Sequence, residues 1–384
     1  MFRLYKLKNY NFRLVILLAA VSSLGVLLVG SAMKSLQTKQ LAGVLLGVAV
    51  MVVVSLIDFS WILNFSWILY GANLVLLLAV FLTGDDAKGA TRWLELGPLR
   101  FQPTELSKIL LILFFAKFLM DHEEDLNKPR TILKAVGLLA VPLALVFAQP
   151  DLKNTITLAL VFCVLMYLAG LSYKIIGGIL LVAVPLTVIF LMIVVQPDQK
   201  LLKDYQRNRI MAFLYPDNEE YSDDTMQQDN SIMAIGSGKL TGKGYDNSEV
   251  SSVSKSNFVS EIQTDFIFAV AGEELGFVGG CTIIVLLFLI SFECLRTSRR
   301  AKDLSGKLIC CGVGTVVAFQ SFLNICVATG LTPNTGTPLP FVSYGLTSIV
   351  SLYIGMGLVL NVGLQNRNYL GGEGHEHRIN RARL

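Results

Sequence analysis

Asp265 is the carboxylate in this sequence that is best placed for chemistry. It ends a long polar stretch, residues 198–265, and stands directly before the apolar run Phe266–Val270. A carboxylate is costly to bury, so at such a junction it can face a polar cavity and accept a proton from a hydroxyl group. Glu273 and Glu274 follow in the same apolar segment and are interpreted as acidic residues at a helix start, where the helix dipole favours them.

Glu105 and Lys108 form a second pair of candidate charges. They lie three residues apart, and side chains at this spacing meet on one face of a helix. The helix expected at residues 104–120 is otherwise mostly apolar, so both charges would face the interior of a helix bundle. Two roles are open for them: a structural ion pair that tolerates burial, or a pair that holds a polar cavity together.

A glycine-rich segment, AIGSGKLTGKGY at residues 234–245, carries Lys239 and Lys243. Its spacing does not match the phosphate loop of nucleotide-binding proteins, G-x-x-x-x-G-K-[ST]. The backbone N–H groups of a glycine-rich loop can still bind a lipid diphosphate. Arg207 and Arg209 precede this segment, and their guanidinium groups could bind the same anion. The alternative for each of these four cations is ordinary solvated charge.

The composition indicates what kind of protein must position these residues. Of the 384 residues, 53% are apolar and only 16% are charged, and the mean hydropathy is +0.60. Soluble domains have about 25% charged residues. These values exclude an ordinary soluble enzyme, a disordered protein and a disulfide scaffold, and they predict a membrane protein with many spans. The chain has only 3 histidines, which argues against a histidine-based metal site.

The apolar segments predict an all-α, polytopic membrane protein with ten transmembrane helices in a single domain, residues 1–384. Residues 308–366 contain no charge, and three prolines divide that run into two spans and a loop. Residues 198–265 are expected to form a large extracytoplasmic loop, and residues 366–384 a cytoplasmic tail. The expected helices cover residues 12–33, 41–58, 61–83, 104–120, 133–150, 154–173, 175–197, 266–292, 307–329 and 343–364.

The basic residues predict the orientation of these helices. With both termini in the cytoplasm, the short cytoplasmic segments carry 17 Lys and Arg residues and the short outer segments carry 6. This bias agrees with the positive-inside rule. The long outer loop has 7 basic and 12 acidic residues, so it does not resemble a nucleic-acid-binding surface.

Six motifs, in order along the chain, resemble those of the SEDS family of bacterial cell-wall polymerases, represented by RodA, FtsW and SpoVE. They extend over most of the chain, so together they are far more specific than any one motif. The motifs are GATRWLELGPLRFQPTELSK (89–108), FAQPDLKNT (147–155), DYQRNRIMAFLYP (204–216), AIGSGKLTGKGY (234–245), QTDFIFAVAGEELGFVG (263–279) and TGLTPNTGTPLPFVSYG (329–345). Three segments depart from the family pattern: SDDTMQQDNS replaces a GYQ-like stretch, QPDLKNT replaces QPDLGT, and SYGL replaces SYGG.

The resemblance implies a peptidoglycan glycosyltransferase that polymerises lipid II, the undecaprenyl-diphosphate-linked disaccharide-pentapeptide, at the outer face of the bacterial cytoplasmic membrane. It also implies a divalent cation, Mg²⁺ or Mn²⁺. The family's essential acidic residue corresponds to Asp265, which is also the candidate metal ligand. The family's charged pair corresponds to Glu105 and Lys108. The arginine of its GA-x-RW motif corresponds to Arg92, which we interpret as a substrate-binding residue.

Besides membrane lipids, the partner that the resemblance implies is a class B penicillin-binding protein, a transpeptidase with one membrane helix. This helix is expected to dock on the eighth and ninth helices of the chain. Close helix packing in lipid favours small residues. These two helices offer Gly276, Gly279, Gly280, Gly312 and Gly314.

The chemistry of such a polymerase suits these residues. The donor sugar leaves as a diphosphate, so the enzyme must activate an acceptor hydroxyl and stabilise departing charge. The α-linked diphosphate and the β product bond imply one inverting displacement, with Asp265 as base and Arg207 and Arg209 near the diphosphate. The short termini and the LRFQPTE segment favour RodA-type elongation over FtsW-type division. A flippase for lipid-linked precursors and a scaffold that docks a partner enzyme are the other open functions.

Overall fold

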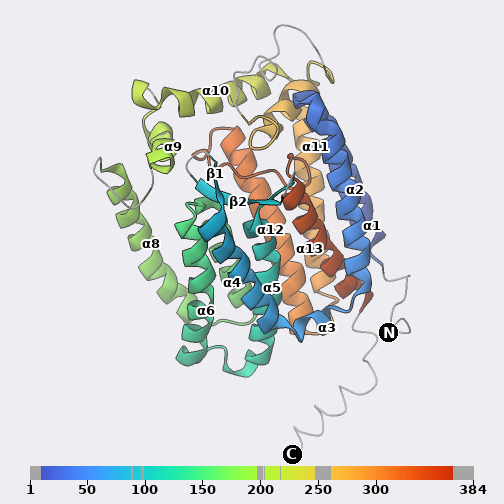
Figure 1. Ribbon diagram of the computed structural model, residues 1–384, viewed down its shortest axis with the longest axis vertical. Helices are drawn as coiled ribbons and strands as arrows, with labels where there is room; N and C mark the ends of the chain where they lie inside the picture. The colour runs from blue at the N-terminus through green and yellow to red at the C-terminus, as the bar shows by residue number, and fades with distance from the viewer. Residues whose placement is uncertain are drawn as a thin grey trace, which may run out of the picture.

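The computed structural model describes residues 10–87, 90–96, 99–196, 202, 204–216, 218–246 and 261–365. They form a bundle of long helices, with α9, α10 and a small sheet at one end (Figure 1). The helices are α1 (Phe12–Ala32), α2 (Lys34–Leu56), α3 (Phe59–Leu63), α4 (Ser66–Thr83), α5 (Pro103–Asp121), α6 (Pro129–Ala148), α7 (Leu152–Leu168), α8 (Tyr173–Val195), α9 (Asp204–Leu214), α10 (Ser222–Ser237), α11 (Ile267–Ser298), α12 (Leu304–Ala328) and α13 (Leu346–Leu364).

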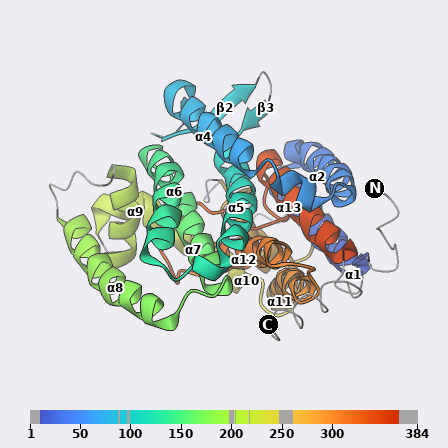
Figure 2. The same ribbon diagram turned by 90° about the horizontal axis from the view of Figure 1, so that it is seen from below.

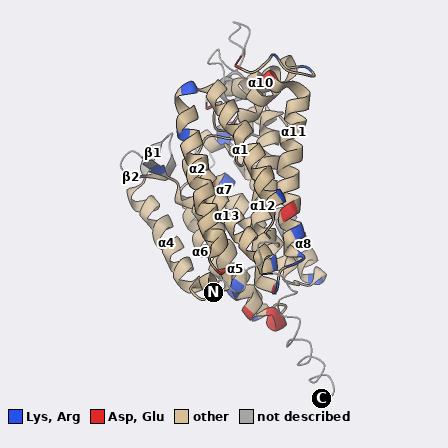
Figure 3. Ribbon diagram, turned by 90° about the vertical axis from the view of Figure 1, so that its right-hand side faces the viewer, with Lys and Arg blue, Asp and Glu red and all other residues tan. Residues whose placement is uncertain are grey.

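Seven helices in the described part of the chain are long and apolar enough to cross a membrane, namely α1, α2, α4, α6, α11, α12 and α13. The most apolar stretches of α12 and α13 are 67% and 78% buried, against 28% for α2, α4 and α6. The helices α12 and α13, together with α5, most of whose residues are also buried, therefore form the centre of the bundle (Figure 2). The ribbon between the two ends of the bundle carries few charged residues (Figure 3).

Tyr353 shows how the central helix α13 packs against α1 and α2. Its side chain is fully buried, and a Cβ on Gly47 of α2 would overlap the tyrosine ring. The hydroxyl of Ser22 on α1 lies 2.8 Å from the Tyr353 hydroxyl. Near the other end of α13, Asn361 Nδ2 donates to the backbone oxygen of Ser55 over 2.8 Å. These contacts set the position of α13 along its axis relative to α1 and α2.

The start of α1 and the end of α13 lie at the same end of the bundle, opposite α10 (Figure 1). The start of α1 is held to the last turns of α11, and the end of α13 is held to the connection between α11 and α12. Asn11 Nδ2 donates to Glu293 Oε2 over 2.9 Å, and Lys302 Nζ donates to Gln365 Oε1 over 2.5 Å. The bundle therefore has one end that gathers the chain ends and another that gathers α9, α10 and the sheet.

The fold is not purely α-helical, so the prediction of an all-α protein is wrong for one segment. The strands β1 (Asp85–Ala87), β2 (Ala90–Leu96) and β3 (Leu99–Phe101) form an antiparallel sheet in the order β1-β2-β3. Thr91 and Trp93 favour extended backbone, and the glycine–proline pair that follows them in the sequence favours a turn.

Two expected segments also differ from the structure. The helix predicted at residues 61–83 is divided into α3 and α4. At the break, the N–H groups of Asn64 and Phe65 bond to the oxygens of Trp61 and Ile62, three residues back, in place of the α-helical pattern. The segment predicted as a loop, residues 198–265, contains α9 and α10.

The glycines expected to dock a partner helix on α12 face the inside of this chain instead. A Cβ on Gly312 would lie 2.9 Å from the Ile112 side chain of α5. A Cβ on Gly314 would lie 3.0 Å from Cβ of Cys294 on α11. The docking prediction is therefore wrong for these two residues, because their small size serves packing within the bundle.

Candidate active site

Asp265 lies in the turn that leads into α11, and hydrogen bonds hold its backbone in place. Its N–H donates to the Glu261 oxygen over 3.0 Å, and its own oxygen accepts from Asn324 Nδ2 over 2.7 Å. The second hydrogen of the Asn324 amide goes to the oxygen of Thr337, also over 2.7 Å. Asn324 is completely buried within α12. One side chain thus joins the Asp265 turn to the loop of residues 329–345.

Ser343 makes a second link between the same two segments. Its hydroxyl accepts from the Leu339 N–H over 2.8 Å and donates to the Thr264 oxygen over 2.5 Å. The N–H of Tyr344 donates to the Gln263 oxygen over 2.9 Å. The loop of residues 329–345 therefore has a fixed position relative to the candidate base.

Gly336, in this loop, is the point where Asp265 and Arg209 come together. Its φ angle is +67°, a conformation that favours glycine. A Cβ at this position would lie 3.1 Å from Oδ2 of Asp265 and 3.4 Å from Nη1 of Arg209. The Gly336 N–H donates to Oδ1 of Asn334 over 3.0 Å, which closes the turn. Glycine is thus needed both for the backbone and for the approach of two charged side chains.

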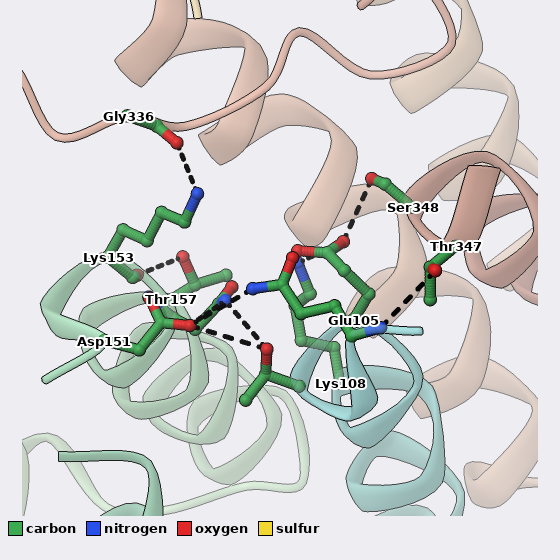
Figure 4. Close-up of polar contacts among 11 residues, drawn as sticks. Glu105, Lys108, Asp151, Lys153, Thr157, Gly336, Thr347 and Ser348 are labelled. Carbon is green, nitrogen blue, oxygen red and sulfur yellow. Dashed lines mark hydrogen bonds and ion pairs between the residues drawn. The ribbon is translucent and has the colours of Figure 1, made fainter. Parts of the chain in front are cut away.

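Lys153 reaches Gly336 from the first turn of α7. Its ammonium donates to the Gly336 carbonyl oxygen (Figure 4). Sequence reasoning did not select this residue, although QPDLKNT is a departure from the family motif. A lysine beside a helix-capping aspartate, in a chain with few charges, was the available signal.

Asp151 holds the first turn of α7 and is fully buried. It caps the helix by accepting from the backbone N–H of Asn154, and it accepts from the Asn154 side-chain amide over 2.7 Å. Gln102 and Thr104, at the start of α5, also donate to it, each over 3.4 Å. The start of α7, and with it Lys153, is therefore fixed against α5.

Glu105 and Lys108 lie on α5 beside this network (Figure 4). Lys108 Nζ is 2.9 Å from Glu105 Oε2, and the two side chains are 1% and 2% exposed. Ser348 of α13 donates to the same glutamate oxygen over 3.0 Å. Each charge compensates the other in a place where either one alone would be costly.

Of the two arginines on α9, the structure brings Arg209 to Gly336. The helix is held against the start of α7, because Tyr205 OH and Gln206 Nε2 donate to the Pro150 oxygen over 2.8 and 3.1 Å. Arg207 is two residues away and projects from a different face of α9. Its Nε is buried and has no hydrogen-bond partner among the described residues.

The glycine-rich segment 234–245 packs against α11 where that helix is interrupted at Gly276, whose φ and ψ are 66° and −165°. A Cβ on Gly276 would overlap the Gly242 backbone, so the docking prediction is wrong for Gly276 as well. Four backbone hydrogen bonds join the two segments. The N–H groups of Phe277 and Val278 donate to the oxygens of Lys239 and Leu240, respectively. The N–H groups of Lys243 and Gly244 donate to the oxygens of Glu273 and Glu274, respectively. The bonds from Phe277 and Val278 cap the part of α11 that follows Gly276. The bonds from Lys243 and Gly244 occupy two N–H groups of the glycine-rich segment, so these groups do not bind an anion in this structure.

Lys243 pairs with Glu273 over 2.8 Å, and Lys239 is exposed. In the described part of the chain neither lysine contacts Asp265, so their role in substrate binding stays a prediction. The interpretation of Glu273 and Glu274 as helix-start charges is wrong, because α11 begins at Ile267 and its first turn has no acidic residue.

Two expected site features lie outside what the described residues test. Arg92 belongs to β2, and its side chain is outside the described part of the structure. Among the described residues, no group of three or more His, Cys, Asp or Glu side chains is placed to hold a metal ion. Mg²⁺ is often bound by one or two carboxylates together with substrate phosphates, and Asp265 fits that type of site.

Comparisons with known proteins agree with this architecture. Residues 2–368 match the family FTSW_RODA_SPOVE, described as a cell cycle protein. The probable peptidoglycan glycosyltransferase FtsW of Geobacter sulfurreducens is 33% identical over 373 residues, which cover 93% of this chain and 96% of that protein. The peptidoglycan glycosyltransferase MrdB of Escherichia coli K12 is 36% identical over 331 residues, 84% of each chain.

Solved structures show the same fold. The rod shape determining protein RodA of Thermus thermophilus matches with a TM-score of 0.67 and 26% identity, over 92% of this chain and 96% of that one. A chain of a peptidoglycan synthase complex, studied for its coordination of polymerization and crosslinking, matches with a TM-score of 0.76 and 28% identity, over 92% of this chain and 97% of that one. The chain therefore belongs to the FtsW, RodA and SpoVE family, the SEDS family.

Proposed function

We propose that this membrane enzyme is a peptidoglycan glycosyltransferase that polymerises lipid II at the outer face of the cytoplasmic membrane, with Asp265 as general base. One observation carries the proposal. The position that a Cβ on Gly336 would take lies 3.1 Å from Asp265 Oδ2 and 3.4 Å from Arg209 Nη1. A base for the acceptor and a cation for the leaving group are the two groups that the transfer needs. The names of the relatives support the activity and the peptidoglycan substrate.

The proposed reaction is one inverting displacement. The acceptor hydroxyl gives its proton to the Asp265 carboxylate while its oxygen forms a bond to the anomeric carbon of the donor. The bond between that carbon and the diphosphate oxygen breaks, and undecaprenyl diphosphate leaves with the electron pair. The α linkage becomes β, and Asp265 then passes its proton to water. Arg209 balances the charge that develops on the diphosphate.

Asp265 would also hold the proposed divalent cation together with substrate oxygens, and the cation would supply charge neutralisation at the diphosphate. The buried contacts of Asp151 hold the start of α7 against α5, and the contact of Glu105 with Ser348 holds α5 against α13. Their contribution is to position the site residues, since rigid support keeps catalytic groups in the productive geometry.

The proposed cellular role is elongation, with a class B penicillin-binding protein as partner. FtsW-type division is the alternative, since both an FtsW protein and a rod shape determining protein match the chain. Complementation separates the two roles. The gene should restore rod shape to cells depleted of their own elongation polymerase and should fail to restore septation to cells depleted of their division polymerase. The reverse pattern would assign the enzyme to division.

The activity itself is tested with purified protein in liposomes that contain labelled lipid II. Glycan chains should form, and they should not form with Asp265→Asn. Exchange of lipid II between leaflets without any polymer would instead assign the protein to the flippase class.

A further inference from the structure

Lys153 is a cation that has no carboxylate partner among the residues that the structure describes. Lys108 and Lys243, which are fully and partly buried, each have one: Lys108 pairs with Glu105, and Lys243 with Glu273. Lys302 is also partly buried, but its ammonium has two side-chain partners, Ser60 and Gln365. In the described part of the chain, Lys153 contacts only the carbonyl oxygen of Gly336 through its ammonium, although an ammonium has three donors. Its side chain is half-buried. It also lies in the first turn of α7, where the helix dipole disfavours a cation.

The three charged side chains that adjoin Gly336 carry a net positive charge. Lys153 lies on the carbonyl side of this residue, and Arg209 and Asp265 lie where a Cβ would be. Two cations thus adjoin one carboxylate, and among the described residues neither Lys153 nor Arg209 forms an ion pair of 4.0 Å or less with Asp265. An excess positive charge beside a partly enclosed carboxylate attracts a multiply charged anion.

We propose that Lys153 is a further substrate-binding residue, which binds the diphosphate of the donor lipid together with Arg209. This inference rests on the proposed function. The chemistry of the substrate selects the donor over the acceptor. In the acceptor, the reacting hydroxyl is on the distal sugar of the disaccharide, so both sugar rings separate it from its own diphosphate. In the donor, the reacting carbon is bonded directly to the diphosphate oxygen, so cations beside the base adjoin the donor's diphosphate.

The position of Lys153 suits this role physically. Asp265 would repel a diphosphate at close range, and cations placed next to both anions offset that repulsion. The contact with the Gly336 oxygen leaves two N–H donors of the ammonium for phosphate oxygens. The buried cap at Asp151 fixes the helical turn that carries Lys153, so little ordering is needed when the ligand binds.

Binding of fluorescent undecaprenyl diphosphate to the full-length protein in detergent tests the inference. Lys153→Gln should weaken binding by about tenfold or more, which is the loss expected for a charged hydrogen bond. Lys153→Arg keeps the charge and should bind within about threefold of the unmodified protein. Lys174→Gln is the matched control, because this exposed lysine begins α8 at the opposite end of the bundle. Equal affinities of Lys153→Gln and Lys174→Gln would overturn the proposal.

Amine labelling of the unmodified protein provides a test that does not depend on a variant folding. Undecaprenyl diphosphate should protect Lys153 from an amine-reactive reagent, measured by mass spectrometry, and should leave Lys174 labelled. Undecaprenol, which lacks the diphosphate, should protect neither lysine. Equal labelling of Lys153 with and without undecaprenyl diphosphate would reject the site.

Glycan synthesis is measured in parallel, so failure of the site and failure of the function can be told apart. If glycan forms while Lys153→Gln binds undecaprenyl diphosphate normally, the polymerase stands and the site is rejected. If no glycan forms but Lys153→Gln loses binding, the diphosphate site stands and the polymerase is rejected.

Discussion

The side-chain amide of Asn324 donates a hydrogen bond of 2.7 Å to the backbone oxygen of Asp265. The same amide donates over 2.7 Å to Thr337, next to Gly336 in the chain. The position of the candidate base relative to Lys153 and Arg209 therefore depends on a completely buried residue of α12. Asn324 acts through these backbone contacts.

Replacing Asn324 with alanine should slow glycan formation and lower stability. The carbonyl oxygens of Thr337 and Asp265 lose their donor. The buried Thr337 oxygen, left unsatisfied, costs about 1–3 kcal/mol, and the partly buried Asp265 oxygen costs less. Because the base is displaced, kcat should fall more than KM for lipid II rises. Ser321→Ala is the control on the same helix, since that buried hydroxyl has no hydrogen-bond partner among the described residues. If both variants lost the same amount of activity and stability, the effect would come from any change in this part of α12, and the predicted role of Asn324 in holding Asp265 would be wrong.

Replacing Asp265 with asparagine should abolish most polymerisation without unfolding the protein. Asparagine keeps the size of the side chain but cannot accept the proton, and a general base contributes about 10²–10⁴-fold. Rates of glycan formation and thermal stability in detergent are the two measurements. Glu273→Gln should show the opposite pattern, with lower stability and a smaller loss of rate, because it breaks the buried pair with Lys243. A near-normal rate for Asp265→Asn would remove the base from the mechanism.

A double-mutant cycle on Glu105 and Lys108 should reveal strong coupling. Glu105→Gln or Lys108→Met alone leaves one uncompensated buried charge, which costs about 3–5 kcal/mol. The double variant removes both charges and should be more stable than either single variant. Chemical unfolding in detergent measures the three variants. Losses that simply add would mean that the two residues are not coupled.

Gly276→Ala should reduce the yield of folded protein. The φ angle of +66° disfavours alanine, and its Cβ would overlap the Gly242 backbone. Gly137→Ala is the control within α6, because a Cβ there meets nothing within 4 Å. That variant should be neutral or slightly stabilising, by up to about 1 kcal/mol. Yield and thermal stability in detergent distinguish the two; equal stability would contradict the packing of segment 234–245 on α11.

The proposed orientation predicts which end of the bundle faces the cell exterior. In a variant without its natural cysteines, a cysteine at Met233 of α10 should react with an impermeant thiol reagent in intact cells. Met233 is 59% exposed. A cysteine at Lys174 should react only after the cells are opened. Labelling of Lys174→Cys alone in intact cells would reverse the topology.

The sequence by itself determined the membrane character of the chain and the segments in which most of its apolar helices lie, but not where each helix begins: α2 starts at Lys34, seven residues before the predicted start. Long charge-free runs are a local property, because each residue in a span must be apolar or paired whatever its neighbours are. The motifs likewise selected Asp265 as the candidate base, which stays a prediction. The three-residue spacing of Glu105 and Lys108 predicted a contact, which the structure has at 2.9 Å. The sheet and the packed glycine segment escaped this reasoning, because both depend on contacts between segments.

Only the tertiary structure shows which charged side chains lie together at the candidate site. Lys153 and Gly336 are 183 residues apart, and Arg209 and Asp265 come from two further segments. No sequence periodicity links positions so far apart. Sequence reasoning therefore gave Arg207 and Arg209 the same role and did not select Lys153 or Asn324. Their selection follows from helix packing: α7, α9, α11 and α12 place these side chains on one loop, and the φ of Gly336 and its missing Cβ leave room for the charged groups to meet.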